Sequence, residues 1–315
     1  MTVFLWELIM QIITKHIPAP RRVSEFKRIY TPSRSVYDGV DTAHFRHGET
    51  YDWVANDFSV LRDGDEWHIV GITHPYPPFF ESAFDFDPET VHEAEYQLFH
   101  ATAPAKSFSE LMRKDSFTDR EKILYPADRP GEEPEIWAPH LMKTGESFGI
   151  VYSPRVMRLA STSDFRTFET GNVLFTCDEP AARDPYILCE NGVFTCVWCG
   201  DRGIMLRRSE DLVKWSDEEL ILPQVFERTS YESPFLMHRE GYYYLFVCLC
   251  DGRNGCYDER TLIFAAEALD GLSGTAPIAT LDAHAPEFVR DESGEYMLSV
   301  YYPENGVNAA RIEFR

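Results

Sequence analysis

Three acidic residues stand at related places in this sequence, each just before the same kind of short apolar run. They are Asp57, Asp184 and Glu232. Carboxyl groups that meet in one pocket can divide acid and base roles, because one stays ionised as a base or nucleophile while another is held protonated as a general acid. A third carboxyl can tune the acid through its charge. We expect this trio to cleave a glycosidic bond, a reaction that requires such a pair of carboxyls.

Several other side chains near these acids could contact a ligand. The candidates for substrate binding are Asn56, Trp137, His140, Arg183 and Tyr231. For His140 two roles stay open, because it can line the pocket or cap its strand. Each acid also has a structural explanation: Asp57 as a turn cap, Asp184 in an ion pair with its neighbour, and Glu232 at a solvated strand end. Three acids at related places make the catalytic interpretation the stronger one.

The acids belong to a segment that occurs five times. Each copy has one or two polar residues, usually a proline, two or three apolar residues, a glycine turn and then aromatic residues. The copies begin at Asn56, Trp137, Arg183, Glu232 and His284. Their proline positions, with Phe58 in the first copy, are 58, 139, 185, 234 and 286, so the steps are 81, 46, 49 and 52 residues. Steps of about 40 to 50 residues that hold several short strands are typical of β-propeller blades.

Five copies predict an all-β chain folded as a five-bladed β-propeller, with the first repeat strand beginning near Asp57. The innermost strand of each blade lines the central channel of a propeller. The copy starts should therefore converge on one axis. We assign the long first step to a surface loop between His74 and about Glu95. Residues 1–50 hold no copy and are expected to pack on the propeller as an N-terminal extension, while residues 51–315 form the catalytic domain.

Composition limits the choice of partner and compartment. Among the 315 residues, 52 are acidic and 30 basic, which gives a formal charge of −22. Such a surface repels nucleic acid and anionic lipid, so a small carbohydrate is the expected partner, while the oligomeric state stays open. No run of 18 apolar residues could span a membrane. The first residues lack the basic start and small-residue cleavage site of a signal peptide, and the seven cysteines form no disulfide framework. We therefore expect a cytoplasmic protein.

Sequence context suggests a role for each acid. Glu232 lies between Tyr231 and the apolar run 234–237, an environment that can raise the pKa of a carboxyl by desolvation. This favours Glu232 as the general acid. Asp184 adds a negative charge that acts in the same direction, and Arg183 is expected to keep Asp184 ionised. Asp57 has no apolar neighbours of this kind and suits the base, which would activate water for an inverting displacement.

These motifs resemble the five-bladed furanosidase superfamily, namely glycoside hydrolase family 43 and its relatives in family 32. The resemblance covers about residues 50–312. It implies that Asp57 is the base or nucleophile, that Asp184 in an Arg-Asp-Pro motif stabilises the transition state or tunes the acid, and that Glu232 lies in the general-acid segment. Trp137-Ala138-Pro139 matches the motif of the second blade. The segment from His284 to Glu287 matches one whose histidine approaches a channel calcium in many family 43 members.

The resemblance implies a glycosidase that requires no cofactor beyond a structural calcium near His284. Phe58 replaces the usual proline, and Ser233 replaces a glycine or cysteine, but the acids are retained. We expect an exo-acting enzyme that cleaves a neutral oligosaccharide of the arabinofuranoside or xyloside type. Two alternatives stay open: a retaining β-fructofuranosidase of the family 32 type, with Asp57 as nucleophile, and a non-catalytic carbohydrate-binding propeller.

Overall fold

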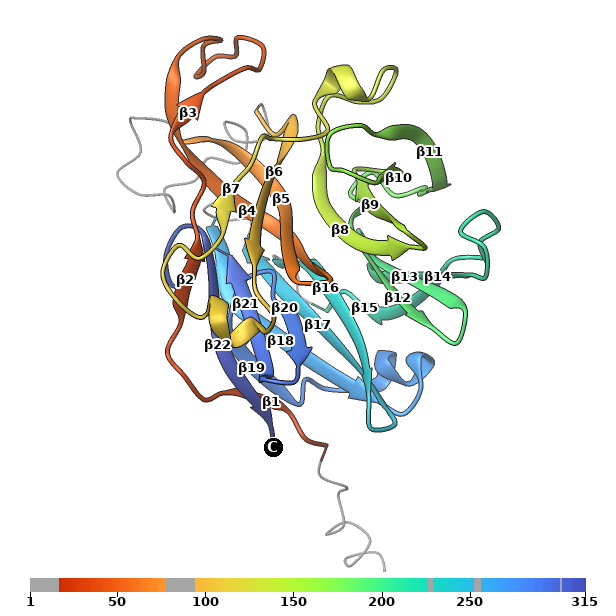
Figure 1. Cartoon of the computed structure of the whole chain (residues 1–315). Helices are drawn as coiled ribbons and strands as arrows, with labels where there is room; N and C mark the ends of the chain where they lie inside the picture. The colour runs from red at the N-terminus through yellow and green to blue at the C-terminus, as the bar shows by residue number, and fades with distance from the viewer. Residues whose placement is uncertain (1–16, 77–93, 226–228, 252–255, 301) are drawn as a thin grey trace, which may run out of the picture.

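The computed structural model describes residues 17–76, 94–225, 229–251, 256–300 and 302–315, and it is nearly all β. Five antiparallel sheets are arranged as blades around a central channel (Figure 1). This confirms the predicted five-bladed β-propeller. The helical elements among the described residues are the short 3-10 turns η1 (Phe108–Leu111), η2 (Pro126–Asp128) and η3 (Leu269–Gly274). No helix in these ranges is long and apolar enough to cross a membrane.

The blades follow one another along the chain. Blade one contains β3 (Ser35–Val36), β4 (Thr50–Asp63), β5 (Glu66–Tyr76), β6 (Gln97–Pro104) and β7 (Thr118–Asp119). Blade two contains β8 (Trp137–Thr144), β9 (Ser147–Ser153), β10 (Val156–Thr162) and β11 (Glu169–Thr176). Blade three contains β12 (Arg183–Glu190), β13 (Val193–Gly200), β14 (Gly203–Ser209) and β15 (Glu219–Pro223). Blade four contains β16 (Thr229–Arg239), β17 (Tyr242–Asp251), β18 (Cys256–Ala266) and β19 (Ala279–Asp282).

Blade five joins the two ends of the described chain. It contains β20 (Glu287–Asp291), β21 (Gly294–Val300) and β22 (Val307–Phe314), and both β1 (Pro20–Arg22) and β2 (Lys27–Tyr30) pair with β22. Part of the region 1–50 thus forms strands of blade five, whereas we expected this region to pack along the side. A propeller must close its ring, and strands from early in the chain provide that closure by covering the edge of β22.

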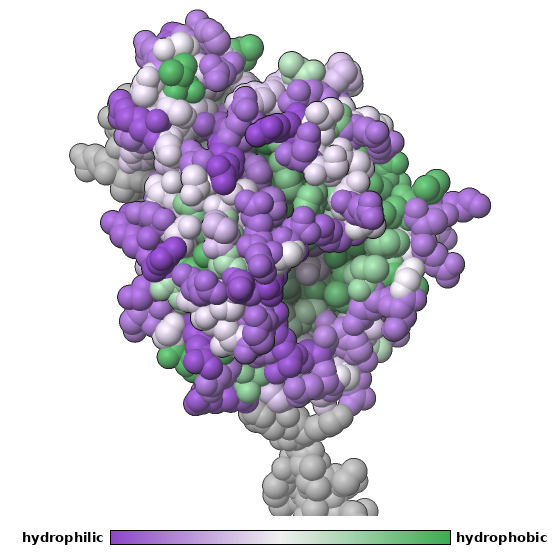
Figure 2. Space-filling view, viewed as in Figure 1, coloured by the Kyte–Doolittle hydropathy of each residue, from purple (hydrophilic) through white to green (hydrophobic). Residues whose placement is uncertain are grey.

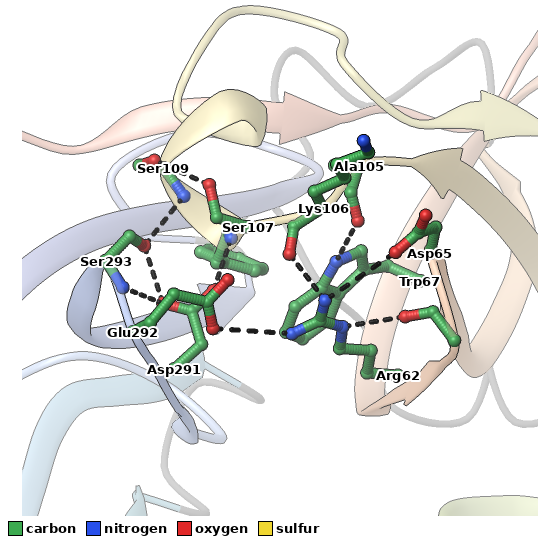
Figure 3. A network of polar contacts seen from close by, with 12 residues as sticks. Arg62, Asp65, Trp67, Ala105, Lys106, Ser107, Ser109, Asp291, Glu292 and Ser293 are labelled. Atoms are coloured by element: carbon green, nitrogen blue, oxygen red, sulfur yellow. Dashed lines mark hydrogen bonds and ion pairs between the residues drawn. The ribbon is translucent and has the colours of Figure 1, made fainter.

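A polar network adds a second connection between blades one and five (Figure 3). The backbone N–H of Phe108 in η1 donates to Asp291 Oδ2 at 2.6 Å, and the N–H of Ser109 donates to Ser293 Oγ at 3.2 Å. Arg62 lies 3.7 Å from Glu292. The turn η1, between β6 and β7 of blade one, therefore fastens the β20–β21 hairpin.

Apolar side chains fill the junctions between blades. In the described residues, each pair of neighbouring blades shares its own cluster of buried apolar side chains. The core is therefore distributed around the ring, and the central channel is left to other side chains. Figure 2 shows a recess near the middle of the face in view, with hydrophobic residues on part of its wall.

Two boundaries differ from the sequence prediction. The strand β4 begins at Thr50, not near Asp57, because an extended stretch before the repeat also pairs with β5 and β3. His74 lies inside β5 and is buried. The greater part of the predicted surface loop, residues 77–93, lies outside the described residues.

Candidate active site

The inner strands place the repeat starts around the channel in two layers. The five copies align on their proline positions, so the residue before each proline forms one layer: Asp57, Ala138, Asp184, Ser233 and Ala285. The residue before that forms the second layer: Asn56, Trp137, Arg183, Glu232 and His284. Glu232 therefore lies one repeat position earlier than Asp57 and Asp184, a difference that we did not predict.

A β-bulge at four of the five copies lets consecutive residues reach the channel. Side chains of a regular strand alternate between its two faces. Here the register shifts at the start of the copy in β4, β8, β12 and β16. Ala138, Asp184, Ser233 and Ala285 have positive φ values between 34° and 60°, a region that non-glycine residues rarely occupy. Such bulges re-aim side chains, and strained backbone of this kind is found preferentially at functional sites.

Asp57 is held by one hydrogen bond and one ion-pair contact. Its Oδ2 accepts a 2.9 Å hydrogen bond from Ser233 Oγ, and its Oδ1 lies 3.5 Å from His284 Nε2. Burial lowers the pKa of His284, but contacts with Asp57 and Cys248 outweigh it, so the net pKa lies well above the ordinary value. The Ser233 hydroxyl and the nearby His284 ring thus orient the Asp57 carboxyl.

Asp184 is buried and shares Ser233 with Asp57. The backbone N–H of Ser233 donates to Asp184 Oδ2 at 3.1 Å, and Arg183 Nε lies 3.5 Å from the same oxygen. Burial raises the pKa of Asp184 to about 7; Arg183 opposes this shift, and the negative charges of Asp57 and Glu232 add to it. We expected Arg183 to keep Asp184 ionised. Burial outweighs it, because the guanidinium makes its shorter contact with Glu232.

Glu232 is linked to the other acids through Arg183. Its Oε1 accepts a 2.9 Å hydrogen bond from Arg183 Nη2, whereas the buried Oε2 has no hydrogen-bond partner in the described part of the chain. The predicted trio is therefore brought together: Ser233 joins Asp57 to Asp184, and Arg183 joins Asp184 to Glu232.

A narrow pocket continues into the channel beside Asp57 and Asp184. Its free volume is about 30 Å³, enough for about two water molecules. It is lined farther along by His140, Tyr186 and Phe235, whose rings contact one another in series at centroid distances of 4.3 and 4.5 Å. Burial lowers the pKa of His140 to about 4, so this ring is neutral at pH 7. These three rings thus form a continuous aromatic part of the pocket wall.

The other predicted residues have different environments. Asn56 is buried in the second layer, and Trp137 is half-buried against the apolar cluster between blades one and two. The side chain of Tyr231 lies in the apolar cluster between blades three and four, not in the pocket. Only its carbonyl oxygen reaches the site, where it accepts a hydrogen bond from Arg183 at 3.3 Å. Strand alternation explains this: Tyr231 precedes the bulge and faces the core.

The calcium expected near His284 stays a prediction. Calcium takes six to eight oxygen ligands, which can include backbone carbonyls and water. Within the described ranges no three His, Cys, Asp or Glu side chains are grouped to hold a metal ion. His284, the predicted metal neighbour, lies with its Nε2 3.5 Å from Asp57 Oδ1.

The sequence interpretation missed two polar residues of the site. Ser233 stands in the same repeat layer as Asp57 and Asp184, so alignment of the copies on their prolines could have identified it. Glu287 lines the narrow pocket, and burial raises its pKa well above the ordinary value. The position of Glu287 directly after the fifth proline could have identified it from the sequence.

Solved structures with the same fold are glycoside hydrolases. An exo-1,5-α-L-arabinanase from a bovine ruminal metagenomic library is 15% identical, with a TM-score of 0.57 over 83% of this chain and 93% of that chain. A family 43 enzyme from Xanthomonas citri, solved with xylose, is 12% identical, with a TM-score of 0.58 over 82% of this chain and 86% of that one.

A family 32 β-fructofuranosidase from Bombyx mori is 14% identical, with a TM-score of 0.56 over 83% of this chain and 59% of that chain. No model of a protein family matches the sequence, and no curated protein matches it. At these identities the likeness concerns the fold, and at that level the predicted resemblance to families 43 and 32 is confirmed.

Proposed function

We propose that this protein is a glycoside hydrolase whose acid and base come from different blades. The observation that carries the proposal is the connected trio, in which Ser233 and Arg183 join Asp57, Asp184 and Glu232 at one end of the channel. A purely structural ion pair would not need two buried carboxyls on one guanidinium and a third carboxyl linked to them through Ser233, because burying unpaired acids is costly. Glycoside cleavage requires one carboxyl that is ionised and another that is protonated.

Each acid has a proposed role. Asp57 accepts a hydrogen bond from Ser233 at one oxygen, has His284 near the other, and acts as the base that activates water. Glu232 has Oε1 fixed by Arg183, so Oε2 is the atom available to give a proton to the leaving-group oxygen. Asp184 adjusts the charge around Glu232 by gaining or losing its own proton near pH 7. Water attack from the side opposite the acid would invert the anomeric centre.

The substrate that we propose is a neutral oligosaccharide with arabinofuranosyl or xylosyl units, cleaved from one end. The names of the arabinanase and of the xylose-bound enzyme with the same fold support these sugars. The strongly negative formal charge of −22 also disfavours acidic glycans. We include a cytoplasmic location in the proposal, since Cys177, Cys189, Cys196, Cys199 and Cys248 are free thiols.

The family 32 alternative rests on the comparable likeness to the Bombyx mori enzyme. In that case Asp57 would be the nucleophile of a retaining reaction on a fructofuranoside. The two proposals share Glu232 as the acid and differ in the anomer released.

A panel of p-nitrophenyl glycosides tests the proposed function. We expect release of p-nitrophenol from the α-L-arabinofuranoside or the β-D-xylopyranoside. Glu232→Gln should lower turnover of natural oligosaccharides by about 10²–10⁴-fold, but should spare aryl glycosides, whose good leaving group needs little protonation. Glu210→Gln changes an exposed acid on blade three and is the matched control. A protein that binds these sugars but cleaves none of them would be a non-catalytic propeller.

A further inference from the structure

A second cleft opens beside the candidate active site, on the side of blade two. Its volume is about 330 Å³, and it is bounded by the segment from Arg129 to Glu135 and by the β9–β10 turn. Ser153 connects the two sites: it lines the cleft, its Oγ accepts from the backbone N–H of Asp184 at 3.3 Å, and the same Oγ donates to the carbonyl of Trp137 at 3.4 Å. The cleft is therefore linked to the backbone of Asp184 through a single residue, Ser153.

The floor of the cleft is rigid. The Glu132 side chain is only 4% exposed and accepts hydrogen bonds from Tyr152 Oη at 2.8 Å and from the N–H of Gly171 at 3.1 Å. The same carboxylate lies 3.7 Å from Arg129 and 3.6 Å from Arg158. Arg129 also donates to main-chain carbonyls, including those of Leu124 and Pro134. Groups held in this way need no reordering when a ligand binds.

The rim of the cleft carries charged groups that do not pair with one another. Arg155 lies in the β9–β10 turn with a φ of 59°, and its backbone is fixed by hydrogen bonds with Ala182 and Cys177. Its exposed guanidinium makes no ion pair or hydrogen bond with a described residue. The carboxylates of Glu133 and Glu135 also line the cleft and likewise make no ion pair with described residues. The cleft thus offers fixed donors and acceptors at separate places.

We propose that this cleft is a second sugar subsite, in which Arg155 and Glu135 bind hydroxyl groups of the unit next to the scissile bond. The ligand is a neutral saccharide, because the three arginines and three glutamates that line the cleft balance in charge. Sugar hydroxyls both donate and accept, which matches unpaired guanidinium and carboxylate groups. This inference rests on the proposed function and adds that the substrate has at least two sugar units.

The variant Arg155→Ala tests this subsite separately from the catalytic site. We expect the KM for arabinotriose or xylotriose to rise about tenfold more than the KM for the matching p-nitrophenyl glycoside, because the nitrophenyl ring has no hydroxyl for Arg155 to bind. Arg155→Lys should restore part of the loss. Arg166→Ala removes another exposed arginine of blade two and should leave both substrates unchanged. Equal KM changes for the two substrates, or none, would contradict the subsite.

Calorimetric binding to the full-length Glu232→Gln protein distinguishes a failure of the subsite from a failure of the proposed function. The trisaccharides should bind more tightly than arabinose or xylose, and Arg155→Ala should remove the difference. Trisaccharide binding that depends on Arg155, without any turnover by the unmutated protein, would uphold the subsite and reject the hydrolase. Equal binding of mono- and trisaccharides would reject the subsite whatever the turnover.

Discussion

Ser233 and Arg183 determine how the candidate catalytic residues are held. Ser233 donates through its hydroxyl to Asp57 and through its backbone N–H to Asp184, so one residue fixes two carboxyls. Arg183 divides its guanidinium between Asp184 and Glu232. Hydrogen bonds to charged groups contribute about 1.5–3 kcal/mol each. Removing one of them should therefore be measurable in catalysis.

Ser233→Ala tests the positioning of Asp57. The variant loses the 2.9 Å hydrogen bond from Oγ to Asp57 but keeps the backbone N–H that Asp184 accepts. We expect kcat on the best aryl glycoside to fall about tenfold or more, with little change in KM, because the base loses orientation while substrate contacts remain. The exposed Ser163→Ala is the control. An unchanged kcat would show that the hydroxyl does not position Asp57.

At the level of the strands, the bulges of β4, β8, β12 and β16 determine which side chains reach the site. The repeat pattern alone does not reveal these bulges. The repeats identify the inner strands and place the candidate residues near one axis. Regular alternation would send Arg183 and Asp184 to opposite faces, and only the register shift and the φ of 60° at Asp184 bring both to the site. The link through Ser233 and the preference of Arg183 for Glu232 depend on this local geometry, so the sequence could not predict them.

The strain in the bulge makes a prediction about stability. Ala138 has a φ of 34°, which favours glycine, whereas Ala101 lies in β6, which pairs with β5 without a register shift. Glycine in an ordinary strand costs about 0.5–1 kcal/mol, but at a positive φ it relieves strain. Ala138→Gly should therefore lower the free energy of unfolding by about 1 kcal/mol less than Ala101→Gly, as measured by denaturant titration. Equal losses would mean that the bulge stores no strain.

For the whole molecule, the sequence predicts the number of blades but not how the ring closes. Blade spacing follows from the copies of the repeat, and these copies are absent from residues 1–50. The closing strands β1 and β2 are short and polar in part, and they become ordered by pairing with β22. The connection from η1 to blade five joins residues more than 180 positions apart, and no local pattern indicates it (Figure 3).

Buried histidines should make the propeller sensitive to acid. His100 contacts the rings of both His68 and Phe165, and burial lowers its pKa to about 3. The unfolded chain binds this proton near pH 6.5, so between about pH 6.5 and 3 the unfolded state holds more protons. The contribution of the neutral His100 ring to stability is therefore complete above pH 6.5. As the pH falls below this value, the free energy of unfolding decreases by up to about 1.4 kcal/mol per pH unit.

The variant His100→Phe keeps an aromatic ring against Phe165 and removes this titration. Urea unfolding at several pH values should show a shallower loss of stability below pH 6.5 for the variant than for the unmutated protein. Parallel curves would mean that His100 is not held neutral in the fold.

The central claim is that Asp57 and Glu232 hydrolyse a glycosidic bond, and the most direct measurement is proton NMR of a p-nitrophenyl glycoside during turnover. The account predicts that the released sugar first appears as the anomer of opposite configuration to the substrate. The signal should be absent with Asp57→Asn and present with Asp52→Asn, an exposed change in the same strand β4. Retention of configuration would transfer Asp57 to the nucleophile role. Equal product from the unmutated and Asp57→Asn proteins, or no product from either, would contradict the account.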